Sequence, residues 1–253
     1  MRFEMTNVLI TGAGSGIGRA ASLAFAKEGA AIAVADVGIE SAQATAQAVE
    51  GLGRKAVVIQ VNVMEPDSVQ AMVENATAEL GSLDVLINSA GVREIVPFLE
   101  LPAEEWLKVI GTNLTGTFLC SQAVAQHLVA QGRGGKIINL SSVAGLMAVP
   151  NRAAYVASKH AVVGLTKEMA MELGDKNIQV NAIAPGVVET SMTDGYFDNP
   201  DVVASLKKAH PAGRWAQPEE IASLMLFVAS DDANFMTGAT IPIDGGFAAG
   251  KSI

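Results

Sequence analysis

The sequence predicts a single-domain α/β fold, residues 1–253, in which helices cover both faces of a doubly wound, seven-stranded and mostly parallel sheet. Short apolar runs alternate along the chain with longer segments of helical periodicity, which is typical of strand–helix–strand units with right-handed crossovers. No internal repeat or low-complexity segment interrupts this alternation. Because half of the residues are hydrophobic, the chain can bury one large core, and the unbroken alternation favours one domain over two small ones.

The first expected strand, residues 7–11, ends in a glycine-rich turn before an alanine-rich helix that reaches residue 29. Glycines in such a turn let backbone amides approach a pyrophosphate at the positive end of a helix. The turn lacks the strict GxGxxG pattern, because Ile17 stands where that pattern requires glycine. Its pattern is TGxxxGxG. It indicates a dinucleotide site, although close helix packing alone would also explain its glycines.

A carboxylate follows the second expected strand. Residues 31–35 are apolar, and Asp36 comes next, 18 residues after Gly18. At this place it can accept hydrogen bonds from an adenosine ribose and repel a 2′-phosphate, which predicts NAD rather than NADP. Two observations qualify this interpretation. Asp36 could simply end the strand at a turn, and Arg19 follows the glycine turn directly, although the turn itself contains no basic residue.

The later elements continue the alternation. Asn113 lies in a largely apolar helical stretch, so its amide either bonds to its own backbone or serves the site. Residues 191–212 lack a strand pattern and are expected to form a mobile lid. Strands are expected at residues 55–61, 83–87, 135–140, 178–184 and 238–244, and helices at residues 40–52, 65–80, 103–130, 152–175 and 218–230.

Residues suited to chemistry follow the fifth strand. Ser142 comes at its carboxyl end, where open α/β sheets bind ligands, and Tyr155 follows 13 residues later. Tyr155 and Lys159 are four residues apart in a helical segment, so they share one helical face. A nearby cation favours the phenolate, and such a pair can move a proton near neutral pH. An isolated pair at this spacing is more often a packed tyrosine and a solvated lysine, so the accompanying motifs decide between the two interpretations.

Composition excludes several classes of function. The formal net charge of −9 and the pI of about 4.8 leave no basic footprint for nucleic acid or an anionic membrane. His127, His160, His210 and Cys120 lack the spacing of metal ligands, so no catalytic metal is expected. A single cysteine excludes an internal disulfide, and neither a signal peptide nor a long apolar segment is evident. These features predict a soluble, cytoplasmic protein.

Together, the motifs resemble those of the classical short-chain dehydrogenase/reductase family over nearly the whole chain. The TGxxxGxG turn at Thr11 is followed by Asn88-Ser89-Ala90-Gly91, by the YxxxK pair, and by Pro185-Gly186 with Thr190. The resemblance implies a Rossmann fold, a homotetramer, and an NAD-dependent enzyme that interconverts a small secondary alcohol and a ketone. Its implied catalytic tetrad is Asn113, Ser142, Tyr155 and Lys159.

The resemblance also implies a role for each member of this tetrad. Tyr155 would take the hydroxyl proton, and Lys159 would lower the pKa of the phenol and hold the nicotinamide ribose. Ser142 would orient the substrate oxygen through a hydrogen bond. Asn113 would hold a water that passes the proton on from Lys159.

Two positions depart from the common family pattern. Ser89 replaces the second asparagine of an NNAG motif, and Asn62 stands where many members have an aspartate that contacts adenine. The amide of Asn62 can still bond to the adenine edge. The implied cofactor contacts are Gly12, Ser15, Gly16, Ile17, Gly18, Asp36, Asn62, Val63, Asn88, Ala90, Gly91, Tyr155, Lys159, Pro185, Gly186, Val188, Thr190 and Met192.

The sequence leaves the substrate open. Arg93 and Glu94 are adjacent opposite charges, and we expect them to form a solvated pair. The other candidates do not distinguish a polyol from a cyclic or aromatic alcohol. The candidate substrate contacts are Val92, Arg93, Glu94, Val143, Met147, Met192 and Tyr196.

Two alternatives to this function remain. A 3-oxoacyl-[acyl-carrier-protein] reductase is similar in length and motifs, but such enzymes generally use NADPH, which Asp36 disfavours, and no basic patch for an acidic carrier is evident. A non-catalytic dinucleotide-binding scaffold is disfavoured because all four tetrad positions carry the family residues. Incubation with NAD and a panel of secondary alcohols would distinguish the scaffold from the enzyme.

Overall fold

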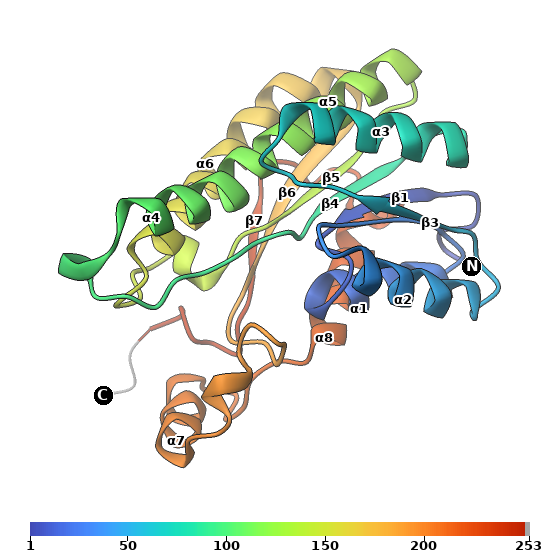
Figure 1. Cartoon of the computed structure of the whole chain (residues 1–253). Coiled ribbons are helices and arrows are strands. Elements are labelled where there is room, and N and C mark those ends of the chain that lie inside the picture. Colours follow the sequence, from blue (N-terminus) through green and yellow to red (C-terminus); the bar gives the residue numbers. More distant parts are fainter. Residues whose placement is uncertain (251–253) are drawn as a thin grey trace.

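The computed structural model describes residues 1–250, in which a seven-stranded sheet separates two layers of helices (Figure 1). The strand order is β3-β2-β1-β4-β5-β6-β7, and every neighbouring pair is parallel, so the expectation of a mostly parallel sheet is confirmed and no described strand is antiparallel. The strands are β1 (Asn7–Thr11), β2 (Ala31–Asp36), β3 (Ala56–Gln60), β4 (Val85–Asn88), β5 (Gly135–Leu140), β6 (Ile178–Pro185) and β7 (Thr240–Ile243).

Helices on both faces explain why the strands are apolar without alternation. In β1, Val8 and Ile10 point into one core while Leu9 points into the other, and all three side chains are fully buried. One face is covered by α1 (Gly16–Lys27), α2 (Ile39–Glu50) and α8 (Pro218–Ala229), and the other by α3 (Pro66–Leu80), α4 (Ala103–Ile110), α5 (Gly116–Gln131) and α6 (Ala153–Leu173) (Figure 1).

The single helix expected at residues 103–130 is present but interrupted. A π-helical turn, Gly111–Thr115, separates α4 from α5 and contains Asn113. Gly111 begins this turn and Gly116 follows it, and the segment after β3 lies against both. A Cβ on Gly111 would lie 2.6 Å from the Met64 side chain, and one on Gly116 would lie 2.7 Å from that of Val63. Hydrophobic periodicity does not detect one inserted residue of this kind, and such turns often occur at functional sites.

The segment expected to be a lid contains no strand. It forms a short 3₁₀ turn (Asp194–Tyr196) and α7 (Pro200–Ala209), which projects beyond the carboxyl ends of the strands (Figure 1). Val188 and Ala216 form an isolated parallel bridge that joins the two ends of this excursion. None of the helices described in residues 1–250 is long and apolar enough to cross a membrane.

The strand order determines where a ligand can bind. From β1 the chain proceeds outward through β2 to β3, and from β4 it proceeds in the opposite direction to β7. The loops after β1 and β4 therefore diverge, and a crevice opens between them at the carboxyl ends of the strands.

Candidate active site

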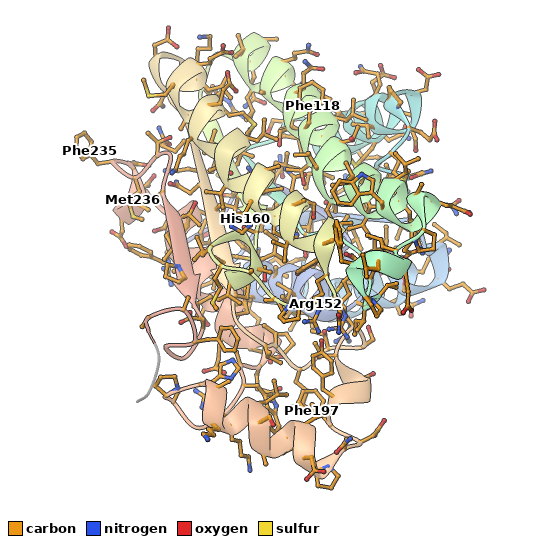
Figure 2. All side chains as sticks on the ribbon, turned by 90° about the vertical axis from the view of Figure 1, so that its left-hand side faces the viewer. Phe118, Arg152, His160, Phe197, Phe235 and Met236 are labelled. Carbon is orange, nitrogen blue, oxygen red and sulfur yellow. The ribbon has the colours of Figure 1, made fainter. Side chains whose placement is uncertain are left out.

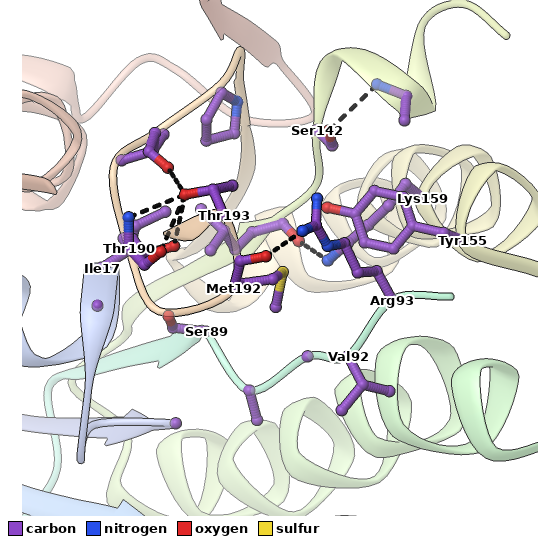
Figure 3. Close-up of a pocket in the computed structure, with 18 of the residues that line it drawn as sticks. Ile17, Ser89, Val92, Arg93, Ser142, Tyr155, Lys159, Thr190, Met192 and Thr193 are labelled. Carbon is purple, nitrogen blue, oxygen red and sulfur yellow. Dashed lines mark hydrogen bonds between the residues drawn. The ribbon is translucent and has the colours of Figure 1, made fainter. Parts of the chain in front are cut away.

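A cavity of about 720 Å³ lies at the carboxyl ends of the strands, and we refer to it as the central cavity (Figure 3). Asn88 and Asn113 are buried and do not line it, and neither do Glu94 and Met147. The sequence-predicted cofactor and catalytic residues that line it are Gly12, Ser15, Gly16, Ile17, Gly18, Asp36, Asn62, Val63, Ala90, Gly91, Ser142, Tyr155, Lys159, Pro185, Gly186, Val188, Thr190 and Met192. The substrate candidates Val92, Arg93, Val143 and Tyr196 line it too.

The glycine turn brings backbone amides to one end of the cavity. Gly12 has a φ of +65°, and a Cβ there would lie 2.7 Å from the backbone of Ala90, so a side chain would close the gap between the two loops. The first turn of α1 carries no acidic residue, and the Ser15 side chain does not cap it. The first amides of α1 are therefore left for a ligand, and a helix end of this kind suits a pyrophosphate.

Asp36 lies beside this turn with a fixed orientation. Its Oδ2 accepts a hydrogen bond from the Gly14 amide at 2.8 Å, and its Oδ1 accepts one from the Gly38 amide at 2.9 Å. The carboxylate retains lone pairs that can accept bonds from ribose hydroxyls. Asn62 uses its side-chain oxygen for the Met64 amide at 3.1 Å, so the amide NH₂ is its remaining polar group. These residues fit the adenosine and pyrophosphate portions of a dinucleotide.

Tyr155 and Lys159 lie on the opposite wall, on the first turns of α6 (Figure 3). The Lys159 Nζ is 5.6 Å from the centroid of the Tyr155 ring and donates a hydrogen bond to the Leu140 carbonyl at 2.6 Å. Burial lowers the pKa of Lys159 to about 8. The carbonyl at the end of β5 therefore holds the ammonium in place, although burial disfavours its charge.

Burial also affects the phenol. It raises the pKa of Tyr155, whereas the Ser142 hydroxyl and the positive charges of Arg93 and Arg152 oppose the rise. Ser142 accepts a hydrogen bond from the Ala144 amide at 3.1 Å, so its own proton can be donated to the Tyr155 oxygen or to a ligand. The groups that favour the phenolate thus come from three separate segments of the chain.

The two buried asparagines organise the layer behind the cavity. The Asn113 side chain binds both backbone groups of Val92, accepting from its amide at 2.8 Å and donating to its carbonyl at 2.8 Å, and it also donates to Ser158 on α6. Asn88 donates to Ser121 at 2.8 Å and to Asn139 at 2.9 Å. Both side chains connect the loop or end of β4 to neighbouring elements. Protein groups occupy both ends of the Asn113 amide, whereas the buried Asn88 Oδ1 has no hydrogen-bond partner within residues 1–250.

The expectation that Arg93 and Glu94 form a solvated pair is wrong. Glu94 is only 3% exposed, and its carboxylate accepts hydrogen bonds from the amides of Ala154 at 2.7 Å and Tyr155 at 3.2 Å. It caps the first turn of α6, where the N-cap residue provides no side-chain bond. Arg93 points instead toward the segment after β6, where it donates to the Met192 carbonyl (Figure 3). It also donates to the Tyr196 hydroxyl.

Sequence reasoning missed Arg152 as a residue of this site. Its guanidinium lines the central cavity and donates to the same Tyr196 hydroxyl as Arg93. The two arginines are 59 residues apart in the sequence, so no local pattern joins them. The available signal was the position of Arg152 three residues before Tyr155, which is about one helical turn.

The described residues contain neither a metal-binding cluster nor an exposed cysteine. Residues 1–250 contain no cluster of three or more histidine, cysteine or acidic side chains that could hold a metal ion. Cys120 is buried in the core, and burial raises the pKa of its thiol to about 12. Cys120 is therefore a protonated packing residue and not a nucleophile.

Comparisons with known proteins find relatives that match nearly the whole chain. A family model described as enoyl-(acyl carrier protein) reductase matches residues 12–248. The 3-oxoacyl-[acyl-carrier-protein] reductase FabG of Thermotoga maritima is 41% identical over 97% of this chain and 99% of its own length. Cyclohexanol dehydrogenase of Acinetobacter sp. strain SE19 is 39% identical, with 97% of this chain and 96% of its own length covered.

Solved structures share the overall fold of the chain. A short-chain type dehydrogenase/reductase from Mycobacterium marinum superimposes with a TM-score of 0.93 at 38% identity, covering 98% of both chains. Carveol dehydrogenase from Mycobacterium avium, solved in complex with NAD, gives a TM-score of 0.94 at 32% identity and covers 98% of this chain and 99% of its own. The chain belongs to the short-chain dehydrogenase/reductase family of oxidoreductases.

Proposed function

We propose that the protein is an NAD-dependent dehydrogenase that interconverts a secondary alcohol and a ketone. The observation that carries this proposal is that Tyr155, Lys159 and Ser142 line the same cavity as the glycine turn and Asp36. The proposed dinucleotide would supply a hydride acceptor or donor when it is bound. Its adenosine end would lie at Asp36 and Asn62, and its nicotinamide end near Thr190 and Lys159.

In this proposal, side chains of the protein hold the substrate oxygen in place and transfer one proton. Ser142 donates a hydrogen bond to the substrate oxygen, because its bond with the Ala144 amide uses the hydroxyl only as an acceptor. Tyr155 takes the proton from the alcohol during oxidation and returns it during reduction. Lys159 stabilises the phenolate through its charge and remains fixed by the Leu140 carbonyl. Asn113 does not touch the substrate in this proposal. Its side chain lies behind the cavity wall and holds Val92 and Ser158 in position through hydrogen bonds.

Tyr155→Phe tests the proton transfer. Removal of a general acid–base typically lowers turnover by about 10²- to 10⁴-fold, and we expect a loss in this range for oxidation of a reactive alcohol from a secondary-alcohol panel. Binding of the dinucleotide, measured by calorimetry, should stay nearly unchanged because the phenol hydroxyl is not its main contact. Near-normal turnover of this variant would remove Tyr155 from the mechanism.

The preference for NAD is tested by comparing kcat/KM for NAD and NADP. The Asp36 carboxylate, fixed by two backbone amides, should repel a 2′-phosphate, and the carveol dehydrogenase that shares this fold was solved with NAD. We expect kcat/KM to be at least about tenfold higher for NAD, and we expect Asp36→Asn to narrow this ratio. A higher value with NADP would favour the second candidate.

That second candidate is a 3-oxoacyl-[acyl-carrier-protein] reductase, which the relative from Thermotoga maritima supports at 41% identity. Reduction of an acyl-carrier-protein thioester with NADPH, and not of free ketones with NADH, would identify it. A scaffold without activity would show dinucleotide binding but no turnover of either class. We also propose a homotetramer, from the family resemblance, and a cytoplasmic location, from the single cysteine, to be tested by light scattering and by cell fractionation.

A further inference from the structure

We propose that the alcohol or ketone substrate carries a carboxylate and that Arg93 and Arg152 bind this group. The inference rests on the proposed function, because it names the substrate class of the same site. It restricts the substrate to a hydroxy acid or keto acid with a short aliphatic or alicyclic body. A free acid of this kind is chemically different from an acyl-carrier-protein thioester.

Two guanidinium groups converge on a single point of the cavity wall. Arg93 comes from the loop after β4 and Arg152 from the residue before α6, and both donate to the hydroxyl oxygen of Tyr196. The Cζ of Arg93 lies 4.5 Å from the centroid of the Tyr196 ring, and that of Arg152 lies 5.8 Å from it. Figure 2 shows Arg152 at the end of α6 that faces α7 and Phe197. Planar guanidinium groups arranged around one oxygen are suited to bind a carboxylate through paired hydrogen bonds.

Among residues 1–250, no acidic side chain pairs with the positive charges of these two arginines. Glu94, the neighbour of Arg93, is occupied by the first amides of α6. The oxygens that accept from the arginines are neutral, namely a phenol and the Met192 carbonyl. Two partly buried like charges around a neutral oxygen repel each other, and an anion would offset that repulsion.

The pair lies close to the catalytic groups. Arg93, Arg152 and Tyr196 all line the central cavity with Tyr155 and Ser142, and the charges of both arginines act on the Tyr155 phenol. A carboxylate bound there would therefore sit near the reacting oxygen, which favours a short body between the two groups. Apolar side chains also line the central cavity and suit an aliphatic or alicyclic body, namely Val92, Val149, Val202 and Leu206.

A competing explanation is that the arginines only fasten the segment after β6. Their bonds to Tyr196 and Met192 would then be their whole function. Tyr196→Phe separates the two explanations, because it removes the hydroxyl and leaves both guanidinium groups. If the arginines bind the ligand, this variant should bind a carboxylate at least as well as the unmodified protein, since the phenol oxygen no longer competes.

The test measures binding and turnover separately. Calorimetry on the protein saturated with NADH compares cyclohexanecarboxylate with cyclohexanecarboxamide, which has nearly the same shape but no charge. We expect the carboxylate to bind at least about tenfold more tightly, as a hydrogen bond to a charged group implies, and to weaken when sodium chloride is raised. Arg93→Gln and Arg152→Gln should each remove most of this difference, while Arg93→Lys and Arg152→Lys should restore part of it.

Arg133→Gln is the matched control, because it removes the same charge from an exposed arginine far from the cavity. Arg133 pairs with Asp84 at the amino-terminal ends of the strands. The control variant should leave both affinities unchanged. Equal binding of the acid and the amide would overturn the inference. So would a loss of acid binding in Tyr196→Phe equal to that in the arginine variants, which would assign the arginines to the segment after β6.

Turnover distinguishes this inference from the proposed function. The substrates are 3- and 4-hydroxycyclohexanecarboxylate and their carboxamides, each with NAD. Faster oxidation of the acids, with kcat/KM reduced in the arginine variants, supports the inference. Oxidation of the amides alone overturns the inference and leaves the dehydrogenase proposal standing. Selective binding of the acids without oxidation of any compound overturns the dehydrogenase proposal and leaves the anion site.

Discussion

Lys159→Met should make the protein more stable at neutral pH, although it removes a proposed catalytic group. Burial lowers the pKa of Lys159 from 10.5 to about 8, so the folded protein binds this proton less tightly than the unfolded chain does. At pH 7 that difference reduces the free energy of unfolding by about 3 kcal/mol. Methionine has a similar length and no charge. The variant also lacks the hydrogen bond that Lys159 donates to the Leu140 carbonyl, and this loss costs about 1 kcal/mol of stability.

The net gain should therefore be about 2 kcal/mol at pH 7, and it should depend on pH. The sign follows from proton binding. Between pH 8 and 10.5 the unfolded chain carries this proton and the folded protein does not, so the stability of the unmodified protein rises with pH in this window. The rise amounts to about 2 kcal/mol between pH 7 and pH 9.5, and Lys159→Met lacks it. The two proteins should become nearly equal in stability at pH 9.5.

The assay is urea unfolding of the cofactor-free protein at both pH values and at one protein concentration, so that any oligomer contributes equally. Lys167→Met is the control, since Lys167 is an exposed lysine two turns farther along α6. It should show no pH-dependent gain. A Lys159→Met variant that is less stable than the unmodified protein at pH 7, or a difference that does not change with pH, would refute the reasoning.

Two further predictions concern the cap of α6 and the glycine turn. Glu94→Ala should lower the free energy of unfolding by about 1–3 kcal/mol, because it leaves the amides of Ala154 and Tyr155 unpaired, and Glu94→Gln should recover part of this in the same urea assay. Gly12→Ala should abolish measurable dinucleotide binding in calorimetry, because its Cβ would lie 2.7 Å from the Ala90 backbone. Gly53→Ala carries the same strain of a positive φ without a clash, so it should lose some stability and retain binding.

Features encoded by local pattern were predictable. The apolar runs predict strands within one or two residues of their observed bounds, because a strand covered on both faces must be apolar along its length. The glycine turn and Asp36 lie in one cavity because carboxyl ends of neighbouring parallel strands meet at one edge. For this reason the order of strands and loops was enough to bring most of the candidate cofactor contacts together.

Features that depend on long-range partners were not predictable. The sequence neighbours of Glu94 suggest a surface ion pair with Arg93, although Glu94 is buried. Its carboxylate finds two amide donors only because the first turn of α6 lies beside it. The π turn at Asn113 differs from an ordinary helix by one residue, which apolar periodicity tolerates. Arg152 can be recognised as a site residue only from its position beside Arg93 and Tyr196, which lie on two other segments.

The short segment after β4 links these features into one arrangement. Three successive residues of this segment contact three different parts of the protein. Asn113 holds the backbone of Val92, Arg93 binds the segment after β6, and Glu94 caps α6. The α6 helix in turn carries Tyr155 and Lys159. The geometry of the proposed acid–base pair therefore depends on residues outside the YxxxK motif. Since the same segment contributes one of the two arginines, a shift of the β4 loop would move the proposed carboxylate contact and the cap of the catalytic helix together.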